Sequence, residues 1–120
     1  MTQLQLEALV DVLALAVAAE VCLLMDEAGL RNLAWIKRDW KSPRSRRDYI
    51  DEALENGHEL ASSDELMADF VAQRAALFTT AAQQKEVCSI LAKILAGTAS
   101  EAQDHEFYSL FVQSLPLRKK

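Results

Sequence analysis

One carboxylate and one imidazole, Glu55 and His58, stand three residues apart in a segment that we expect to be helical. This spacing puts both side chains on one side of a helix, and helical bundles that hold two metal ions carry such a pair twice, with two further carboxylates. The chain has a single pair, interrupted by Gly57 at an expected helix end. We therefore interpret His58 as a surface histidine near a helix C-terminus, where the helix dipole favours it, and expect no metal site or cofactor.

Acidic residues gather in the same region, and they could hold Mg²⁺ for chemistry on phosphates. They are Asp51, Glu52, Glu55, Glu59, Asp64, Glu65 and Asp69. All-α nucleotide pyrophosphohydrolases use paired carboxylates of this general kind, but their pattern needs a second acidic pair in the following helix, whereas Glu65 and Asp69 are four positions apart. A magnesium site needs only one or two carboxylates plus substrate. A Mg-dependent nucleotide hydrolase that uses residues 51–69 is thus a weaker alternative to a solvated acidic helix face.

Nucleophilic chemistry has even less support in the sequence. The two cysteines, Cys22 and Cys88, lie within apolar helical patterns, which is typical of core thiols, and nothing places His58 or His105 near them. The chain also contains no phosphate-binding glycine-rich loop, no GxSxG and no HExxH. We therefore predict that the protein is not an enzyme and expect no small-molecule substrate.

The most distinctive stretch is WIKRDWKSPRSRRDY, from Trp35 to Tyr49, with six Lys or Arg residues, two Trp and one Tyr in fifteen positions. We define residues 31–47 as the basic segment, with a formal charge of +6, and residues 48–69 as the acidic segment, with a formal charge of −8. A short basic tail covers residues 116–120. Charge is thus strongly segregated along a chain whose net charge is −5.

Three interpretations of this segregation stay open. In the first, Arg44, Arg46 and Arg47 form surface ion pairs with the neighbouring acids, which contribute little to stability. In the second, the basic segment contacts the phosphates of RNA or DNA while a Trp stacks on a base. In the third, the basic face of one molecule binds the acidic face of another protein or of a second copy.

The two Trp residues, Trp35 and Trp40, lie five positions apart, which places them on different sides of one helix, so that they cannot both be core residues. We expect one of them to be partly exposed beside the arginines, because Trp and Arg together are typical anchors of interfaces. The predicted partner-binding residues are Trp35, Lys37, Arg38, Trp40, Lys41, Arg44, Arg46 and Arg47, with Asp51 and Glu55 from the acidic segment.

The elements that must position these residues are predicted from composition. A chain of 120 residues that is 51% apolar fits one domain with a real core. It has only three Gly and two Pro, which indicates long regular elements, and Ala and Leu outnumber the β-branched and aromatic residues, which favours helices. We predict an all-α fold: a compact bundle of five to six helices in a single domain over residues 1–120, with a long, largely buried N-terminal helix.

The N-terminal helix is predicted over residues 3–28, since Thr2 begins a capping-box pattern and Gly29 is a typical helix end. The helix has a polar side only as far as Asp11 and is apolar all round after it. Such a helix either lies at the centre of the bundle or packs on another chain as well. Glu20, opposite Asp11, would then be buried and would need a partner.

Capping and punctuation residues predict the remaining helices. The pair of Thr80 and Gln83 fits either a new helix start or an internal position of a long helix. We expect helices over 30–40, from Ser42-Pro43 to Asn56-Gly57, after a cap at Ser62, over the apolar run of Val87 to Leu95 with an end at Gly97, and from Thr98 to Pro116.

The remaining features concern the compartment and the class of function. The chain begins without the basic region of a secretory signal, and the apolar stretch over 12–25 is shorter than the roughly 20 residues that cross a bilayer, so we expect a cytoplasmic protein that does not bind membranes. We predict a small non-enzymatic interaction protein (an adaptor, inhibitor or assembly subunit) that binds a protein partner, and a homodimer is one such assembly. The alternative is a helical subunit of a nucleoprotein complex that contacts the RNA or DNA backbone through residues 31–47.

Overall fold

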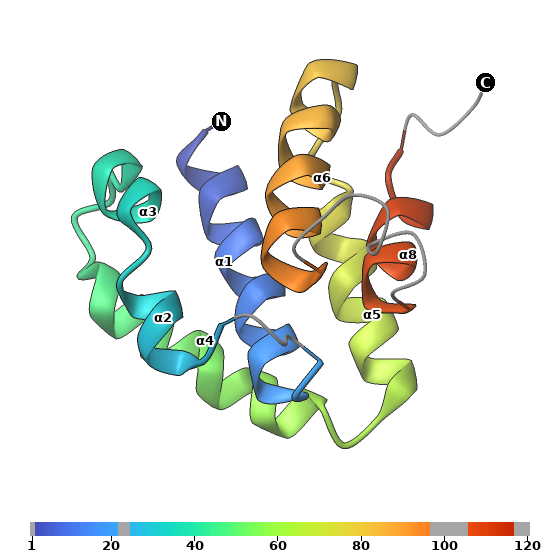
Figure 1. Ribbon diagram of the computed structural model, residues 1–120, viewed down its shortest axis with the longest axis horizontal. Coiled ribbons are helices and arrows are strands. Elements are labelled where there is room, and N and C mark those ends of the chain that lie inside the picture. The colour runs from blue at the N-terminus through green and yellow to red at the C-terminus, as the bar shows by residue number, and fades with distance from the viewer. Residues whose placement is uncertain (1, 22–24, 97–105, 117–120) are drawn as a thin grey trace.

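The structure, a computed structural model, describes residues 2–21, 25–96 and 106–116. All regular elements within these ranges are helices, which confirms the predicted all-α bundle (Figure 1). The helices are α1 (Gln3–Ala18), α2 (Glu27–Arg31), α3 (Ala34–Asp39), α4 (Arg46–Leu60), α5 (Asp64–Ala75), α6 (Ala81–Ala96) and α8 (Glu106–Gln113). None of the described helices is long and apolar enough to cross a membrane.

Helix α1 lies at the centre of the bundle and is buried along most of its length, as predicted. Its side chains from Leu9 to Ala16 are buried apart from Asp11, and they pack against α2, α3, α4 and α5 of the same chain. The apolar sides of α1 are therefore covered within one chain. Of the two explanations for its sequence pattern, the central position accounts for it without a second chain.

The start of α1 is as predicted, but its end is not. The Thr2 hydroxyl accepts a bond from the Gln5 backbone N–H at 3.1 Å, and the Gln5 side chain accepts one from the Thr2 N–H at 3.0 Å. The helix then ends at Ala18, ten residues before the predicted end, because Glu20 adopts a left-handed conformation with a φ of 62°. The N–H of Val21 donates to the Ala16 carbonyl and that of Glu20 to the Val17 carbonyl, which is the bonding of a Schellman motif. Glu20, predicted to be buried, is exposed.

Replacing Glu20 with glycine is expected to stabilise the protein by about 1 kcal/mol, because a side chain is strained at this φ and glycine is not. Urea unfolding would measure the gain. Ala19→Gly is the matched control, since Ala19 has an ordinary helical φ of −81° and should lose stability when replaced. A destabilised Glu20→Gly protein would contradict the Schellman end of α1.

The predicted helix over 30–40 is divided into α2 and α3. Gly29 does not end a helix but lies inside α2, where its N–H donates to the Asp26 side chain at 2.8 Å, and Asp26 caps this helix. The extended backbone of Leu33 separates the two helices. The chain thus turns between α2 and α3, which places α3 beside the start of α1 (Figure 1).

Helices α4 and α5 also begin later than predicted. Ser45, not Ser42, caps α4, and Ser63, not Ser62, caps α5. Gly57 lies inside α4 rather than at its predicted end, and it lies directly on α1 beside Ala14 and Ala18, so that α4 continues to Leu60. Absence of a side chain at Gly57 allows the two helices to approach closely.

Helices α6 and α8 complete the described part of the core. The capping box of Thr80 and Gln83 forms and begins α6, which confirms the interpretation of this pair as a new helix start. Val87, Leu91 and Leu95 are buried along α6. Phe111 of α8 packs edge-on against Phe78, with ring centroids 6.0 Å apart. The predicted helix end at Gly97 and helix start at Thr98 lie outside the described residues.

Candidate interaction surface

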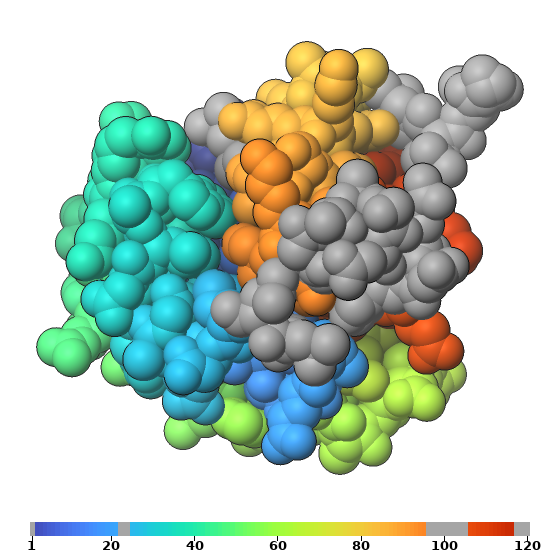
Figure 2. Space-filling view, viewed as in Figure 1, coloured from blue at the N-terminus to red at the C-terminus, as the bar shows by residue number. Residues whose placement is uncertain are grey.

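The predicted basic and aromatic partner-binding residues lie at one end of the molecule, formed by α3, the connection over 40–45 and the first turn of α4, whereas Asp51 and Glu55 lie further along α4. In the space-filling view this end is the teal surface at the left (Figure 2). The connection is held to the start of α1, because the Lys41 backbone N–H donates to the Gln3 side chain at 2.8 Å. We define the basic end by four exposed cationic residues that form no ion pair with α4, namely Lys37, Arg38, Lys41 and Arg47.

The side chains of Trp35 and Trp40 are both half-buried and pack against the core, so the expectation that only one of them could contact the core was wrong. The expectation that a Trp side chain is partly exposed beside the arginines is confirmed. Trp40 is fixed by two contacts. Its indole N–H donates to the Arg44 carbonyl at 2.9 Å, and its ring lies 5.4 Å from that of Tyr49. The Arg44 guanidinium covers Tyr49 at 5.3 Å. Trp40 thus helps to build the end of the molecule and is not a free stacking platform.

Several arginines of the basic segment are neutralised or engaged within the chain, as the first interpretation of the charge pattern expects. Arg31 of α2 pairs with Asp51 of α4 at 2.7 Å, and Arg44 pairs with Glu52. Arg46 donates to the Arg31 carbonyl at 2.5 Å. These contacts fasten α2 and the 40–45 connection onto α4, so Asp51, Arg44 and Arg46 have a structural use besides any role in binding.

The four residues of the basic end are not neutralised by the acids of α4. Within the described ranges, Lys37, Lys41 and Arg47 form no ion pair, and Arg38 pairs with the adjacent Asp39 at 2.8 Å on a side chain that is 73% exposed. Arg47 and Asp51 are one turn apart on α4, but Asp51 is paired with Arg31 instead. Glu55, the last predicted partner-binding residue, is exposed on α4. A positive surface patch therefore remains available to a partner.

The residues considered for metal chemistry have other contacts. His58 is exposed in the last turn of α4, as predicted, and its Nε2 lies 3.2 Å from the Glu27 carboxylate of α2. Among the described residues no three side chains of His, Cys, Asp or Glu are close enough together to hold a metal ion. The acidic residues of the segment 48–69 are distributed along α4 and α5.

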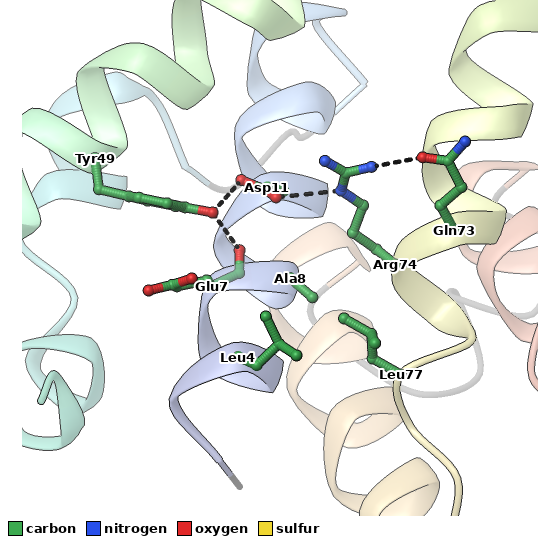
Figure 3. Close-up of a pocket in the computed structure, with 8 residues that line it drawn as sticks. All are labelled: Leu4, Glu7, Ala8, Asp11, Tyr49, Gln73, Arg74 and Leu77. Atoms are coloured by element: carbon green, nitrogen blue, oxygen red, sulfur yellow. Dashed lines mark hydrogen bonds and ion pairs between the residues drawn. The ribbon is translucent and has the colours of Figure 1, made fainter. Parts of the chain in front are cut away.

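A second polar arrangement, which the sequence did not predict, links three helices around a cleft of about 280 Å³ (Figure 3). Asp11 of α1 accepts a bond from the Tyr49 hydroxyl at 2.9 Å and one from Arg74 Nε at 3.2 Å. Arg74 also stacks on the Phe70 ring at 3.7 Å. The cleft is lined by Leu4, Glu7, Ala8, Asp11, Tyr49, Gln73, Arg74 and Leu77.

Burial changes the acidity of two groups in this arrangement. It raises the pKa of Asp11 above the ordinary 3.8, although the bonds from Tyr49 and Arg74 act in the opposite direction. The pKa of Tyr49 is also raised, by burial first and then by the charge of Asp11. Both oxygens of Asp11 have partners, so the arrangement is a polar bridge between α1, α4 and α5 rather than a set of free catalytic groups.

The chain matches no family model, no curated protein and no solved structure. Its function is therefore inferred from the chemistry of its surface.

Sequence reasoning found the basic end but missed the polar bridge. Asp11, Tyr49 and Arg74 are separated by 38 and 25 positions, and no local spacing connects them. The available signal was weaker: Asp11 is the last acid on the polar side of α1, and Arg74 is a single cation on a helix with acids at its start. Only the packing of α4 and α5 on α1 brings the three together.

Proposed function

We propose that this chain is a small, non-enzymatic, cytoplasmic interaction protein that binds an acidic surface of a partner protein through the basic end. The observation that carries the proposal is the exposure of Lys37, Arg38, Lys41 and Arg47 without neutralisation by α4. The half-buried Trp35 on the same short helix adds apolar area, and an aromatic side chain beside cations is typical of protein interfaces.

A protein partner is favoured over a nucleic acid for two reasons. The net charge of the chain is −5, whereas dedicated nucleic-acid binders are usually basic. Base recognition by stacking also needs an accessible aromatic face, and Trp40 is already held by Tyr49 and the Arg44 carbonyl. Binding of RNA or DNA is kept as an outcome of the test.

The test compares two double charge reversals that change the net charge by the same amount. Lys37→Glu/Lys41→Glu alters the basic end, and Lys85→Glu/Lys93→Glu alters exposed lysines of α6. Fluorescence anisotropy would follow a labelled oligoglutamate peptide, single-stranded RNA, single-stranded DNA and duplex DNA, from low to physiological ionic strength. We expect the peptide to bind, and to bind at least about tenfold more weakly to the first variant than to the wild type or the second variant.

Other results would change the conclusion. An equal loss in both variants would mean that only net charge matters, and no peptide binding at low ionic strength would remove the proposal. Tighter binding of RNA or DNA than of the peptide, with a steep dependence on salt, would instead support the nucleoprotein alternative.

A further inference from the structure

Helix α5 has an exposed face that no described part of the chain covers. This face is formed by exposed residues that follow the helical repeat. Counted from Glu65, they lie one, four and eight positions further along α5, and they are Glu65, Leu66, Asp69 and Gln73. The Leu66 side chain is 48% exposed. Glu65 and Asp69 form no ion pair within the described residues. The face combines an apolar side chain with two unneutralised carboxylates.

This face continues into the cleft of the polar bridge. Gln73 lies two turns beyond Leu66 on the same side of α5 and lines the cleft together with Leu4 of α1. Leu4 is 60% exposed, and it and Leu66 are the large apolar side chains with high exposure among the described residues. We call the exposed face of α5 the acceptor face and define it as Glu65, Leu66, Asp69 and Gln73.

The acceptor face and the basic end complement each other and belong to different ends of the molecule. Figure 1 places α3 and α5 toward opposite ends of the longest axis, and Figure 2 shows the teal basic end at the left and the yellow-green α5 at the lower right. One surface offers lysines and an indole, and the other offers carboxylates and the exposed Leu66. A single molecule cannot join them, but two molecules can.

We infer that the acceptor face binds the basic end of a second copy of this chain, so that molecules associate head to tail. The inference rests on the proposed function, since it names the partner of the basic end. Lys37 and Lys41 would pair with Glu65 and Asp69, and Trp35 would supply apolar contact to Leu66. Because the two surfaces differ and lie toward opposite ends, the contact is heterologous, and repeating it produces open chains or closed rings of more than two copies.

Complementary charge reversals test this contact by sedimentation velocity at low ionic strength. The wild type is expected to grow beyond a dimer with rising concentration. Lys37→Glu/Lys41→Glu and Glu65→Lys/Asp69→Lys should each associate at least about tenfold more weakly than the wild type. In an equal mixture of the two variants, the native basic end meets the native acceptor face and the two reversed surfaces also carry opposite charges, so the mixture should regain the association that each variant alone has lost.

Controls separate this contact from a general effect of charge. Glu86→Lys/Glu106→Lys makes the same charge change on exposed acids of α6 and α8 and should still assemble. Leu66→Ser removes the apolar contact without adding charge and should also weaken assembly. A wild type that stays monomeric at every concentration, or a mixture that associates no more strongly than either variant alone, overturns the inference. If the oligoglutamate peptide still binds in that case, the proposed function stands and only the identity of the partner is wrong.

Discussion

Replacing Gly57 with alanine is expected to destabilise the protein by about 1–3 kcal/mol, although alanine is the better helix former by about 1 kcal/mol. A Cβ atom at Gly57 would lie 3.1 Å from the Ala18 Cβ, 3.2 Å from the Ala14 carbonyl oxygen and 3.2 Å from the Leu15 Cα. Two of these three are backbone atoms of the buried central helix, which cannot rotate away as a side chain can. Helix α4 therefore has to move off α1.

Urea unfolding of three variants would measure this effect. Asn56→Ala is the matched control, because Asn56 is the preceding residue of the same helix and is exposed, so its replacement should change stability by no more than about 0.5 kcal/mol. Gly57→Leu should cost more than Gly57→Ala, since a larger side chain has no space against α1. A Gly57→Ala protein as stable as the wild type would mean that α4 does not pack this closely.

Replacing Arg74 with methionine is expected to cost about 2–3 kcal/mol at neutral pH, because it leaves the Asp11 carboxylate without its cation. Asp11 has a side chain that is only 14% exposed, so water replaces the lost partner poorly. Methionine still packs on the Phe70 ring, which separates the loss of the ion pair from a loss of apolar contact.

The pH dependence of this variant gives a distinctive signature. The native pKa of Asp11 is raised, so its contribution to stability is complete below 3.8 and is lost as the pH rises through the native value. Arg74 lowers this pKa by its hydrogen bond and its charge, and without it the native pKa of Asp11 rises further. The difference in unfolding free energy between the wild type and Arg74→Met should therefore be small in acid and grow as Asp11 ionises.

Two controls identify the source of that dependence. In an Asp11→Asn background, Arg74→Met should have an effect that no longer changes with pH. Arg44→Met makes the same substitution at an arginine that also meets a carboxylate and an aromatic ring, but on an exposed side chain, and it should have little effect. Equal losses for Arg74→Met at acid and neutral pH would contradict the role of the polar bridge.

The sequence predicted the helical class and several helix starts because these depend on local chemistry. The capping boxes at Thr2 and Thr80 formed as their spacing indicated. Helix ends were predicted less well, because the glycines that we expected at helix ends lie at other positions in the structure. Gly29 and Gly57 lie inside helices, and Glu20 takes the left-handed position that glycine usually occupies. At these places, tertiary packing decides the outcome.

The candidate surface divides in the same way. Its cationic character could be predicted from the distribution of charge along the sequence, and the exposure of Lys37 and Lys41 follows from their charge. Which arginines are engaged could not be predicted from the sequence, because the packing of α2 on α4 brings Arg31 and Asp51 together. The half-burial of both Trp side chains could not be predicted from helical spacing either. Helix α3 has only six residues, which is too short to form distinct buried and exposed sides.

The position of the two Trp residues determines what the intrinsic fluorescence of this protein reports. Trp35 and Trp40 are the only tryptophans of the chain, and both lie at the end formed by α3 and the 40–45 connection. Trp40 emission depends on the Arg44 carbonyl and the Tyr49 ring that surround its indole. Emission is therefore a label-free sensor of events at this end. Because α6 and α8 contain no tryptophan, Trp emission does not report on them directly, whereas far-ultraviolet circular dichroism measures the helix content of the whole chain. A comparison of the two signals therefore distinguishes detachment of α3 from unfolding of the whole bundle.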